Sequence, residues 1–336
     1  MTKVAFFDVD EKEQTTLSRV FGKEEAYELS FYRKSLDTQT ADGAKDAEGI
    51  GIFIQSRITQ DVLGLLPRLK TIATMSTGFD HIDMDTCNAR NITVCNVPSY
   101  GDNTVAEYAF GLIIALARKL KPTFERVGRG IFSRAGLMGT DIRGKTLGLI
   151  GTGRIGAHMA RLGWAFGMKV IAYDLRPDNA LSKEFGVTFT NLEDVLQQAD
   201  VISLHVPYLP STHHLINAER LRRVKPTALL LNTSRGKVVD TKAVSTALRE
   251  GRLGGAALDT FEGEEVWIEE EFLKRDELAA IPLREAMESF SIMRSESAIL
   301  TPHNAFNTRE AMDRILITTA ENLKAYFSGN PQNVTH

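Results

Sequence analysis

Short apolar runs separated by helix-compatible segments most restrict the fold of this chain. In its second half they recur about every 25 to 30 residues, the spacing of βαβ units, in which a strand and its crossover helix need roughly 30 residues. These runs are Thr146–Ile150, Lys169–Tyr173, Val201–Leu204, Ala228–Leu231 and Gly254–Leu258. The first hundred residues alternate similarly, with runs at Val4–Val9, Gly51–Gln55, Thr71–Met75 and Ile92–Val97. Because such alternation favours parallel sheets covered by helices, we expect an α/β protein with two doubly wound parallel-sheet domains.

Length and charge exclude several classes of protein. The chain has 336 residues, enough for about two domains. Its net charge of -3 offers no basic surplus for neutralising phosphates, so we expect no nucleic-acid partner. The longest apolar run, Tyr108–Ala117, has ten residues, whereas crossing a bilayer needs roughly 20. We interpret it as part of a buried helix that begins near Asn103, and we expect no membrane partner.

The N-terminus and the cysteines indicate a cytoplasmic protein. The first residues, MTKVAFFDVDEKE, lack the basic start and apolar stretch of a secretory signal. Cys87 and Cys95 do not have the spacing of a disulfide framework or a zinc site, so we expect no metal.

Two segments near the C-terminus have distinctive patterns. Asn307, with Glu310 three residues later, predicts a capped amphipathic helix through Phe327. The segment Glu262–Glu271 contains six glutamates and predicts a solvated helical insertion, with a mobile lid or an interface element as the alternative.

A glycine motif follows the first apolar run of the second series. Gly151, Gly153 and Gly156 fit G-x-G-x-x-G, in which the glycines permit a tight turn, close approach to a pyrophosphate and close helix-strand packing. Asp174, 18 residues beyond Gly156, ends the next predicted strand and can bind a ribose diol. Its charge favours NAD over NADP, although Arg176 lies close enough in sequence to offset it in part. The alternative is an ordinary glycine turn with Asp174 as a loop cap.

Three later segments, which contain Arg235, Glu264 and His303, each lie at the end of a predicted strand and together suggest a reaction. Arg235 can bind a carboxylate through paired N–H bonds. His303 can exchange a proton near neutral pH. Glu264 can hold the imidazole and favour its charged form. Together they suit hydride transfer to or from a 2-hydroxy acid, although each alone could be a surface arginine, a loop histidine or a solvated glutamate.

With these motifs in this order, the chain resembles the D-2-hydroxyacid dehydrogenase family over essentially its whole length, and within it the D-lactate dehydrogenase branch. The resemblance depends on six segments: Gly151–Gly156, Asp174, His205–Pro207, Asn232–Gly236, Ala257–Glu264 and Thr301–Phe306. It implies a Rossmann NAD-binding domain at 101–301, inserted into a flavodoxin-like substrate domain at 1–100 and 302–336. It also implies a homodimer, for which the apolar face of the helix after Asn103 is one candidate surface; burial of that face within one chain would look identical.

The resemblance also implies roles for individual residues. His303 would be the acid/base, Glu264 its partner and Arg235 the carboxylate ligand. The implied cofactor contacts are Gly151, Gly153, Arg154, Ile155, Gly156, Asp174, Val206, Pro207, Thr212, Thr233, Ser234 and Asp259, the last near the nicotinamide carboxamide. The implied substrate contacts are Ser76, Thr77, Gly78, Tyr100, Arg235 and Phe306.

The predicted function is therefore reversible, NAD-dependent reduction of a small 2-keto acid, with pyruvate to D-lactate favoured. Phosphite oxidation by the same scaffold and an NADH-sensing, corepressor-like binding protein are the alternatives. Formate oxidation is disfavoured, because the formate enzymes that this chain resembles pair the histidine with glutamine rather than with a glutamate such as Glu264. The acidic insertion leaves the substrate side chain open.

Overall fold

The computed structural model describes residues 1–22, 26–264 and 283–335. The chain separates into two compact units. Unit 1 comprises Met1–Gly101 and Asn307–His336, and unit 2 comprises Asp102–Phe306. The return to unit 1 thus lies after Phe306, whereas the sequence prediction placed it after residue 301.

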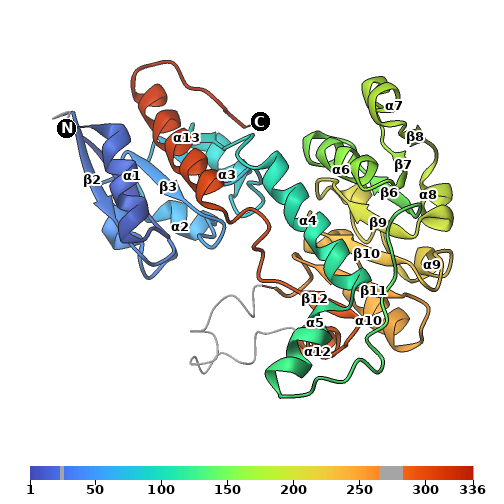
Figure 1. Cartoon of the computed structure of the whole chain (residues 1–336). Helices are drawn as coiled ribbons and strands as arrows, with labels where there is room; N and C mark the ends of the chain where they lie inside the picture. Colours follow the sequence, from blue (N-terminus) through green and yellow to red (C-terminus); the bar gives the residue numbers. More distant parts are fainter. Residues whose placement is uncertain (23–25, 265–282, 336) are drawn as a thin grey trace. The chain divides into compact units, whose positions relative to one another are not determined.

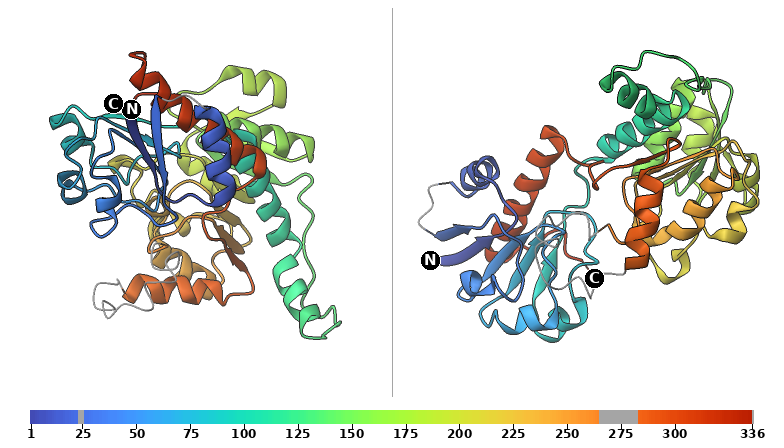
Figure 2. Two further views of the ribbon diagram at one scale, coloured as in Figure 1. Left: turned by 90° about the vertical axis from the view of Figure 1, so that its left-hand side faces the viewer. Right: turned by 90° about the horizontal axis from the view of Figure 1, so that it is seen from below.

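Unit 1 contains a five-stranded parallel sheet in the order β2-β1-β3-β4-β5. Its strands are β1 (Thr2–Phe6), β2 (Tyr27–Phe31), β3 (Gly49–Ile52), β4 (Thr71–Thr74) and β5 (Thr93–Cys95). This is the strand order of flavodoxin-like folds. Helices α1 (Glu11–Phe21) and α13 (Arg309–Phe327) lie side by side although they are far apart in sequence (Figures 1 and 2).

The two faces of this sheet have different cores. On one face, Phe6 packs against Phe21 of α1. On the other, Ile50 and Ile72 pack with residues of α2 (Gln60–Gly64) and α3 (Met84–Ala89). A 3₁₀ helix, η1 (Ala41–Ala44), lies between β2 and β3. Both cysteines are buried in this unit.

The cap of α13 differs from the prediction. Thr308, not Asn307, is the N-cap, and its hydroxyl accepts a hydrogen bond from Ala311 N at 3.2 Å. The helix therefore begins at Arg309. The prediction was wrong by one residue because a neighbouring side chain of equal capping ability supplies the bond.

Unit 2 contains a seven-stranded parallel sheet in the order β12-β11-β10-β9-β6-β7-β8. Its strands are β6 (Thr146–Ile150), β7 (Lys169–Tyr173), β8 (Thr188–Phe189), β9 (Val201–Leu204), β10 (Leu229–Asn232), β11 (Gly255–Leu258) and β12 (Ala298–Leu300). The strand order reverses direction between β6 and β9, which is the position where dinucleotides bind in such sheets.

Helices cover both faces of this sheet. One face packs against α4 (Asp102–Ala117) and α6 (Arg154–Ala165), which lie next to each other (Figure 1). The other packs against α8 (Leu192–Gln198), α9 (Ala218–Leu221), α10 (Thr241–Arg249) and α12 (Leu283–Met293). The remaining helical segments are α5 (Leu120–Gly128), α7 (Asn179–Phe185), η2 (Pro210–Thr212) and η3 (Gly236–Val238). The predicted class, two parallel-sheet α/β domains, is confirmed.

The apolar run Tyr108–Ala117 lies within α4, whose side chains Ala109, Leu112 and Ile113 are buried in unit 2. Among the helices of the described residues, none is long and apolar enough to cross a membrane. Two residues of the predicted acidic insertion, Glu262 and Glu264, lie in a turn after β11. The rest of the insertion falls within residues 265–282, which lie outside the described residues.

Candidate active site

The three predicted catalytic residues follow three adjacent strands. Arg235 comes after β10, Glu264 after β11 and His303 after β12. Because these strands are parallel neighbours, their carboxyl ends share one edge of the sheet. The buried side chain of Asn232 joins two of the loops, donating to Arg235 O at 2.9 Å and to Thr260 O at 3.0 Å.

His303 and Glu264 are in direct contact. His303 Nδ1 lies 3.2 Å from Glu264 Oε1, and the two side chains are 23% and 18% exposed. Glu264 Oε2 accepts a hydrogen bond from Phe261 N at 3.1 Å, which orients the carboxylate. With Nδ1 facing the carboxylate, Nε2 is left for another partner.

Asp259 holds the loop that carries His303. It is 1% exposed. Its Oδ1 accepts hydrogen bonds from Thr301 Oγ1 at 2.5 Å and Asn304 N at 2.8 Å, and its Oδ2 accepts one from Ala305 N at 2.9 Å. His303 N also donates to Asp259 O at 3.0 Å. His303 has a φ of 52°, a conformation that a non-glycine residue keeps only where its surroundings enforce it.

These bonds also explain why residues 302–306 belong to unit 2. The carboxylate attaches the segment directly to the end of β11. The carboxylate bonds of Asp259 thus organise this loop, and the contact with the nicotinamide carboxamide that the sequence suggested stays a prediction.

The loop of Arg235 packs against the turn of Glu264. Arg235 Nη1 donates to Ser234 O at 2.8 Å. At the next position, a Cβ built on Gly236 would lie 2.5 Å from the backbone of Phe261, so only glycine permits this approach. Phe306, a predicted substrate contact, has its ring 6.4 Å from that of His303.

The glycine motif forms the turn between β6 and α6. Gly151 has a φ of 92°, and a Cβ built on it would lie 2.5 Å from His205 O. A Cβ on Gly156 would lie 2.2 Å from Gly151 O, whereas one on Gly153 would meet no atom within 4 Å. Arg154 begins α6 and forms an ion pair with Asp102 at 3.4 Å. Ile155 packs into the core beneath.

Asp174 lies at the end of β7 and contacts this turn. Its Oδ2 accepts hydrogen bonds from Thr152 N at 2.6 Å and Thr152 Oγ1 at 2.9 Å, and its Oδ1 accepts one from Arg176 N at 2.8 Å. Burial alone would raise the pKa of Asp174, but these hydrogen bonds outweigh it and lower the pKa below its ordinary value of 3.8. The carboxylate is therefore charged at neutral pH, which suits a ribose diol and opposes a 2′-phosphate.

The remaining predicted cofactor residues lie at the ends of β9 and β10. Val206 packs against the core, Pro207 is exposed, and Thr212 Oγ1 donates to Pro207 O at 2.8 Å. Ser234 Oγ donates to Asn232 Oδ1 at 2.7 Å. Thr233 Oγ1 is buried and has no hydrogen-bond partner among the described residues. An unsatisfied hydroxyl at the end of β10, an open Gly153 and a charged Asp174 fit a bound dinucleotide.

Of the predicted substrate residues of unit 1, Ser76, Thr77 and Gly78 lie in the loop after β4, and Tyr100 follows β5. Ser76 Oγ donates to Gly78 O at 2.6 Å, and Thr77 Oγ1 donates to Val97 O at 2.8 Å. Tyr100 O accepts a hydrogen bond from Arg314 Nε. Their contact with substrate stays a prediction.

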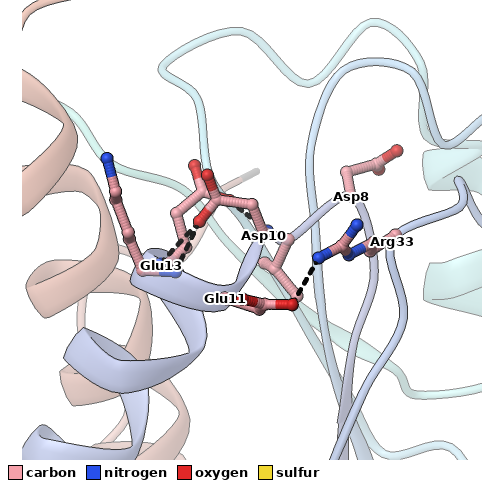
Figure 3. A pocket seen from close by; sticks show the side chains of 7 residues that line it. Asp8, Asp10, Glu11, Glu13 and Arg33 are labelled. Carbon is pink, nitrogen blue, oxygen red and sulfur yellow. Dashed lines mark hydrogen bonds and ion pairs between the residues drawn. The ribbon is translucent and has the colours of Figure 1, made fainter.

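Unit 1 also has a surface depression at the start of α1 (Figure 3). Its acidic groups are already paired: Glu13 Oε2 accepts a bond from Asp10 N at 2.7 Å, and Glu11 pairs with Arg33 at 2.7 Å. Asp8 accepts a hydrogen bond from Ser56 Oγ at 2.6 Å. These contacts cap a helix and organise loops. Within residues 1–22, 26–264 and 283–335, no group of His, Cys, Asp or Glu could hold a metal ion.

Sequence reasoning missed three residues that organise the site: Asn232, Glu262 and His214. Asn232 was visible as a polar residue ending a buried strand, a signal that could have identified it. Glu262 and His214 form a pair at 2.7 Å, but the first lies in a glutamate-rich run and the second in a polar loop.

Comparisons with known proteins agree on one family. A family model described as "D-isomer specific 2-hydroxyacid dehydrogenase, NAD binding domain" matches residues 110–305. A 2-hydroxyacid dehydrogenase homolog of Zymomonas mobilis is 39% identical over 292 residues, 86% of each chain. A glyoxylate reductase of Korarchaeum cryptofilum is 35% identical and covers 93% of this chain and 91% of its own.

Solved structures give the same result. A D-lactate dehydrogenase from Aquifex aeolicus, in complex with NAD and lactic acid, superimposes with a TM-score of 0.87 at 36% identity, over 97% of this chain and 96% of that one. The pyruvate reductase of Chlamydomonas reinhardtii gives a TM-score of 0.89 at 32% identity, over 98% of both chains.

Proposed function

The chain belongs to the D-isomer specific 2-hydroxyacid dehydrogenase family, and from that premise we propose that it reversibly reduces a small 2-keto acid to the D-2-hydroxy acid, with pyruvate to D-lactate as the favoured reaction. The family predicted from the motifs is confirmed, and the chain is an NAD-dependent oxidoreductase. The contact between His303 and Glu264 carries the proposal, because it pairs a proton-exchanging group with a carboxylate at the sheet edge where ligands gather.

His303 serves as the acid/base in this proposal. Its Nδ1 is held by Glu264, so Nε2 gives a proton to the keto oxygen in reduction and takes the hydroxyl proton in oxidation. Glu264 keeps the imidazole in one orientation, with Nδ1 facing the carboxylate.

Arg235 serves as the carboxylate ligand. Its guanidinium can present two parallel N–H donors to the two carboxylate oxygens, which fixes the orientation of the substrate as well as its charge. The close packing of Gly236 on Phe261 supports this role, since it fixes the start of the Arg235 loop relative to the Glu264 turn.

NAD is the cofactor, and when bound it supplies or accepts the hydride at its nicotinamide ring. We propose that Asp174 binds the ribose diol and that Gly151, Gly153, Arg154 and Gly156 accommodate the pyrophosphate. Val206, Pro207, Thr212, Thr233 and Ser234 would line the rest of the site.

Glyoxylate is the second candidate substrate. Curated relatives named glyoxylate reductase are 34% to 36% identical to this chain. The aromatic ring of Phe306 beside His303 favours a substrate with an apolar side chain, which pyruvate has and glyoxylate lacks.

We also propose a homodimer formed through α5 and the loop after it. Phe124, Phe132 and Met138 are 69%, 80% and 87% exposed, respectively. Three large apolar side chains exposed within 15 residues of sequence support an interaction surface there. The apolar face of α4, the candidate surface in the sequence, is instead buried within unit 2. Sedimentation of Phe132→Asp beside the unchanged protein tests this: a shift from dimer to monomer is expected, and a monomeric unchanged protein would refute it.

Steady-state rates with NADH test the reaction. Pyruvate, glyoxylate, hydroxypyruvate and larger 2-keto acids should be reduced, with the highest kcat/KM for pyruvate, and phosphite with NAD⁺ should give no turnover. Tight NADH binding without reduction of any keto acid would favour a binding protein. Turnover of phosphite alone would assign that oxidation instead.

The variant His303→Gln tests the acid/base role. Turnover should fall by roughly 10² to 10⁴-fold, the usual contribution of general acid-base catalysis. NADH affinity, measured by fluorescence titration, should be retained. An unchanged kcat would move the proton transfer to another group.

A further inference from the structure

The turn that carries Glu264 also carries a second glutamate that makes a separate set of contacts. Glu262 Oε1 lies 2.7 Å from His214 Nε2, and Glu262 Oε2 accepts a hydrogen bond from Thr241 N at 3.1 Å. The Glu262 backbone is bound as well, since its N–H donates to Thr241 Oγ1 at 3.2 Å and its carbonyl accepts from Ser289 Oγ at 3.4 Å. The Glu262 side chain is only 18% exposed. Through these bonds, Glu262 connects the turn to the start of α10 and to the side of α12.

His214 connects the same glutamate to the loop of Arg235. The backbone N–H of His214 donates to the carbonyl of Lys237 at 2.8 Å, and Lys237 lies two residues beyond Arg235. Its φ of 47° is a conformation that costs a non-glycine residue free energy and is kept where contacts enforce it. His214 Nε2 must carry a proton to donate to the carboxylate, and it does so in one neutral tautomer as well as in the cation.

Contacts inside the turn cannot fix its position. The bonds from Phe261 N to Glu264 Oε2 and from Glu264 N to Phe261 O both lie within four residues. They shape the turn but would move with it. The buried ring of Phe261 anchors its start, and the bonds of Glu262 anchor its middle.

We propose that His214 and Glu262 are positioning residues, which keep the Glu264 carboxylate within reach of His303 Nδ1 and align it with the Arg235 loop. The inference rests on the proposed function, in which Glu264 assists proton transfer by His303. Neither residue needs to touch the substrate. Their effect passes through Glu264, so losing the pair should lower kcat while leaving NADH binding intact.

A double-mutant cycle tests this route. His214→Leu removes the N–H donor at similar size, and we expect kcat for pyruvate reduction to fall about tenfold, within the roughly 100-fold that a 1 Å misplacement can cost. NADH affinity should stay within about twofold of the unchanged protein. In a Glu264→Gln background, His214→Leu should change kcat by less than about twofold, because the route through Glu264 is already lost.

Three further variants control for a general effect on folding. His213→Leu places the same side chain one residue earlier, where the ring stacks on His214 at 4.0 Å and its Nδ1 lies 3.5 Å from the Tyr208 hydroxyl, and kcat should be retained. His214→Gln keeps an N–H donor and should recover most of the lost rate. Glu262→Gln removes the charge at constant shape and should also lower kcat, with melting temperatures recorded for all variants.

The outcomes separate the inference from the proposed function. If His214→Leu lowered kcat by the same factor in the unchanged protein and in the Glu264→Gln variant, the positioning role would be overturned. Equal losses of kcat from His213→Leu and His214→Leu would also overturn it. Failure of His214→Gln to recover any rate would also count against it. An unchanged kcat for Glu264→Gln alone would refute the role of Glu264 in the proposed function, and the inference with it.

Discussion

Replacing Asp259 with asparagine should disable the enzyme without removing any group assigned to the chemistry. The carboxylate receives three hydrogen bonds from Thr301, Asn304 and Ala305, which flank His303. Asparagine keeps one oxygen and presents an NH₂ group in place of the other. If the oxygen stays at the Oδ1 position, the NH₂ faces Ala305 N–H, and two donors oppose each other at a site that is 1% exposed.

The size of the effect follows from these bonds. A hydrogen bond to a charged group contributes about 1.5–3 kcal/mol, and a neutral one about 1 kcal/mol. Two bonds would weaken by about 1 kcal/mol each, and the third would be lost with an unsatisfied buried donor, costing about 1–3 kcal/mol more. Relaxation of the loop would recover part of this, so we expect a loss of stability of about 2–4 kcal/mol and, because His303 shifts with its loop, a fall in kcat of about 100-fold.

Stopped-flow reduction of pyruvate, thermal unfolding and NADH titration measure the three consequences separately. Thr301→Val is the matched control, since it removes one of the three donors at nearly constant shape and should cost about 1 kcal/mol of stability with little change in kcat. If Asp259→Asn instead weakened NADH binding while its kcat at saturating NADH stayed normal, the carboxylate would act on the cofactor, and the loop-positioning role would be refuted.

Four other substitutions have defined outcomes. Arg235→Lys should raise KM for pyruvate and lower kcat, because a point charge cannot reproduce the two-pronged carboxylate contact; unchanged kinetics would remove Arg235 from that role. Gly156→Ala should destabilise the protein by about 1–3 kcal/mol, since its Cβ would lie 2.2 Å from a backbone oxygen. Gly153→Ala, by contrast, should preserve the melting temperature and weaken only NADH binding. Equal melting temperatures for both variants would contradict this. Burial alone would raise the pKa of Asp200, but hydrogen bonds, including one from Lys225 Nζ at 2.9 Å, lower it below the ordinary 3.8. The stabilisation by Asp200 is therefore present above pH 3.8 and lost as the pH falls through the lowered value. Lys225→Met should move acid unfolding to higher pH, and an unmoved midpoint would show that the pair does not stabilise the fold.

Central strands were predictable because both of their faces are buried. Strands β6, β9 and β10 read as nearly continuous apolar runs for this reason. The edge strands β2 and β8 were missed for reasons of composition and length. β2 alternates apolar with polar residues, and β8 has two residues, so neither produces such a run.

The location of the site was predictable for a topological reason. Parallel strands with crossover helices must all end at one edge, so polar residues after successive strands come together there. This logic grouped the segments of Arg235, Glu264 and His303. The motifs named Glu264 as the partner of His303, and the two side chains lie 3.2 Å apart; topology alone would not single out Glu264, because the turn geometry after β11 decides which side chain of a glutamate-rich run faces the histidine.

Three residues that hold the loops of the site in place share a physical property. Asn232, Asp259 and Glu262 each use buried or half-buried polar atoms to bind the backbone of a neighbouring loop. Such bonds join segments that are distant in sequence, so no local pattern encodes the partner. Because the groups assigned to the chemistry lie on loops rather than within strands, their alignment depends on these cross-loop bonds. We therefore expect substitutions at Asn232, Asp259 and Glu262 to impair kcat more than substrate or cofactor binding.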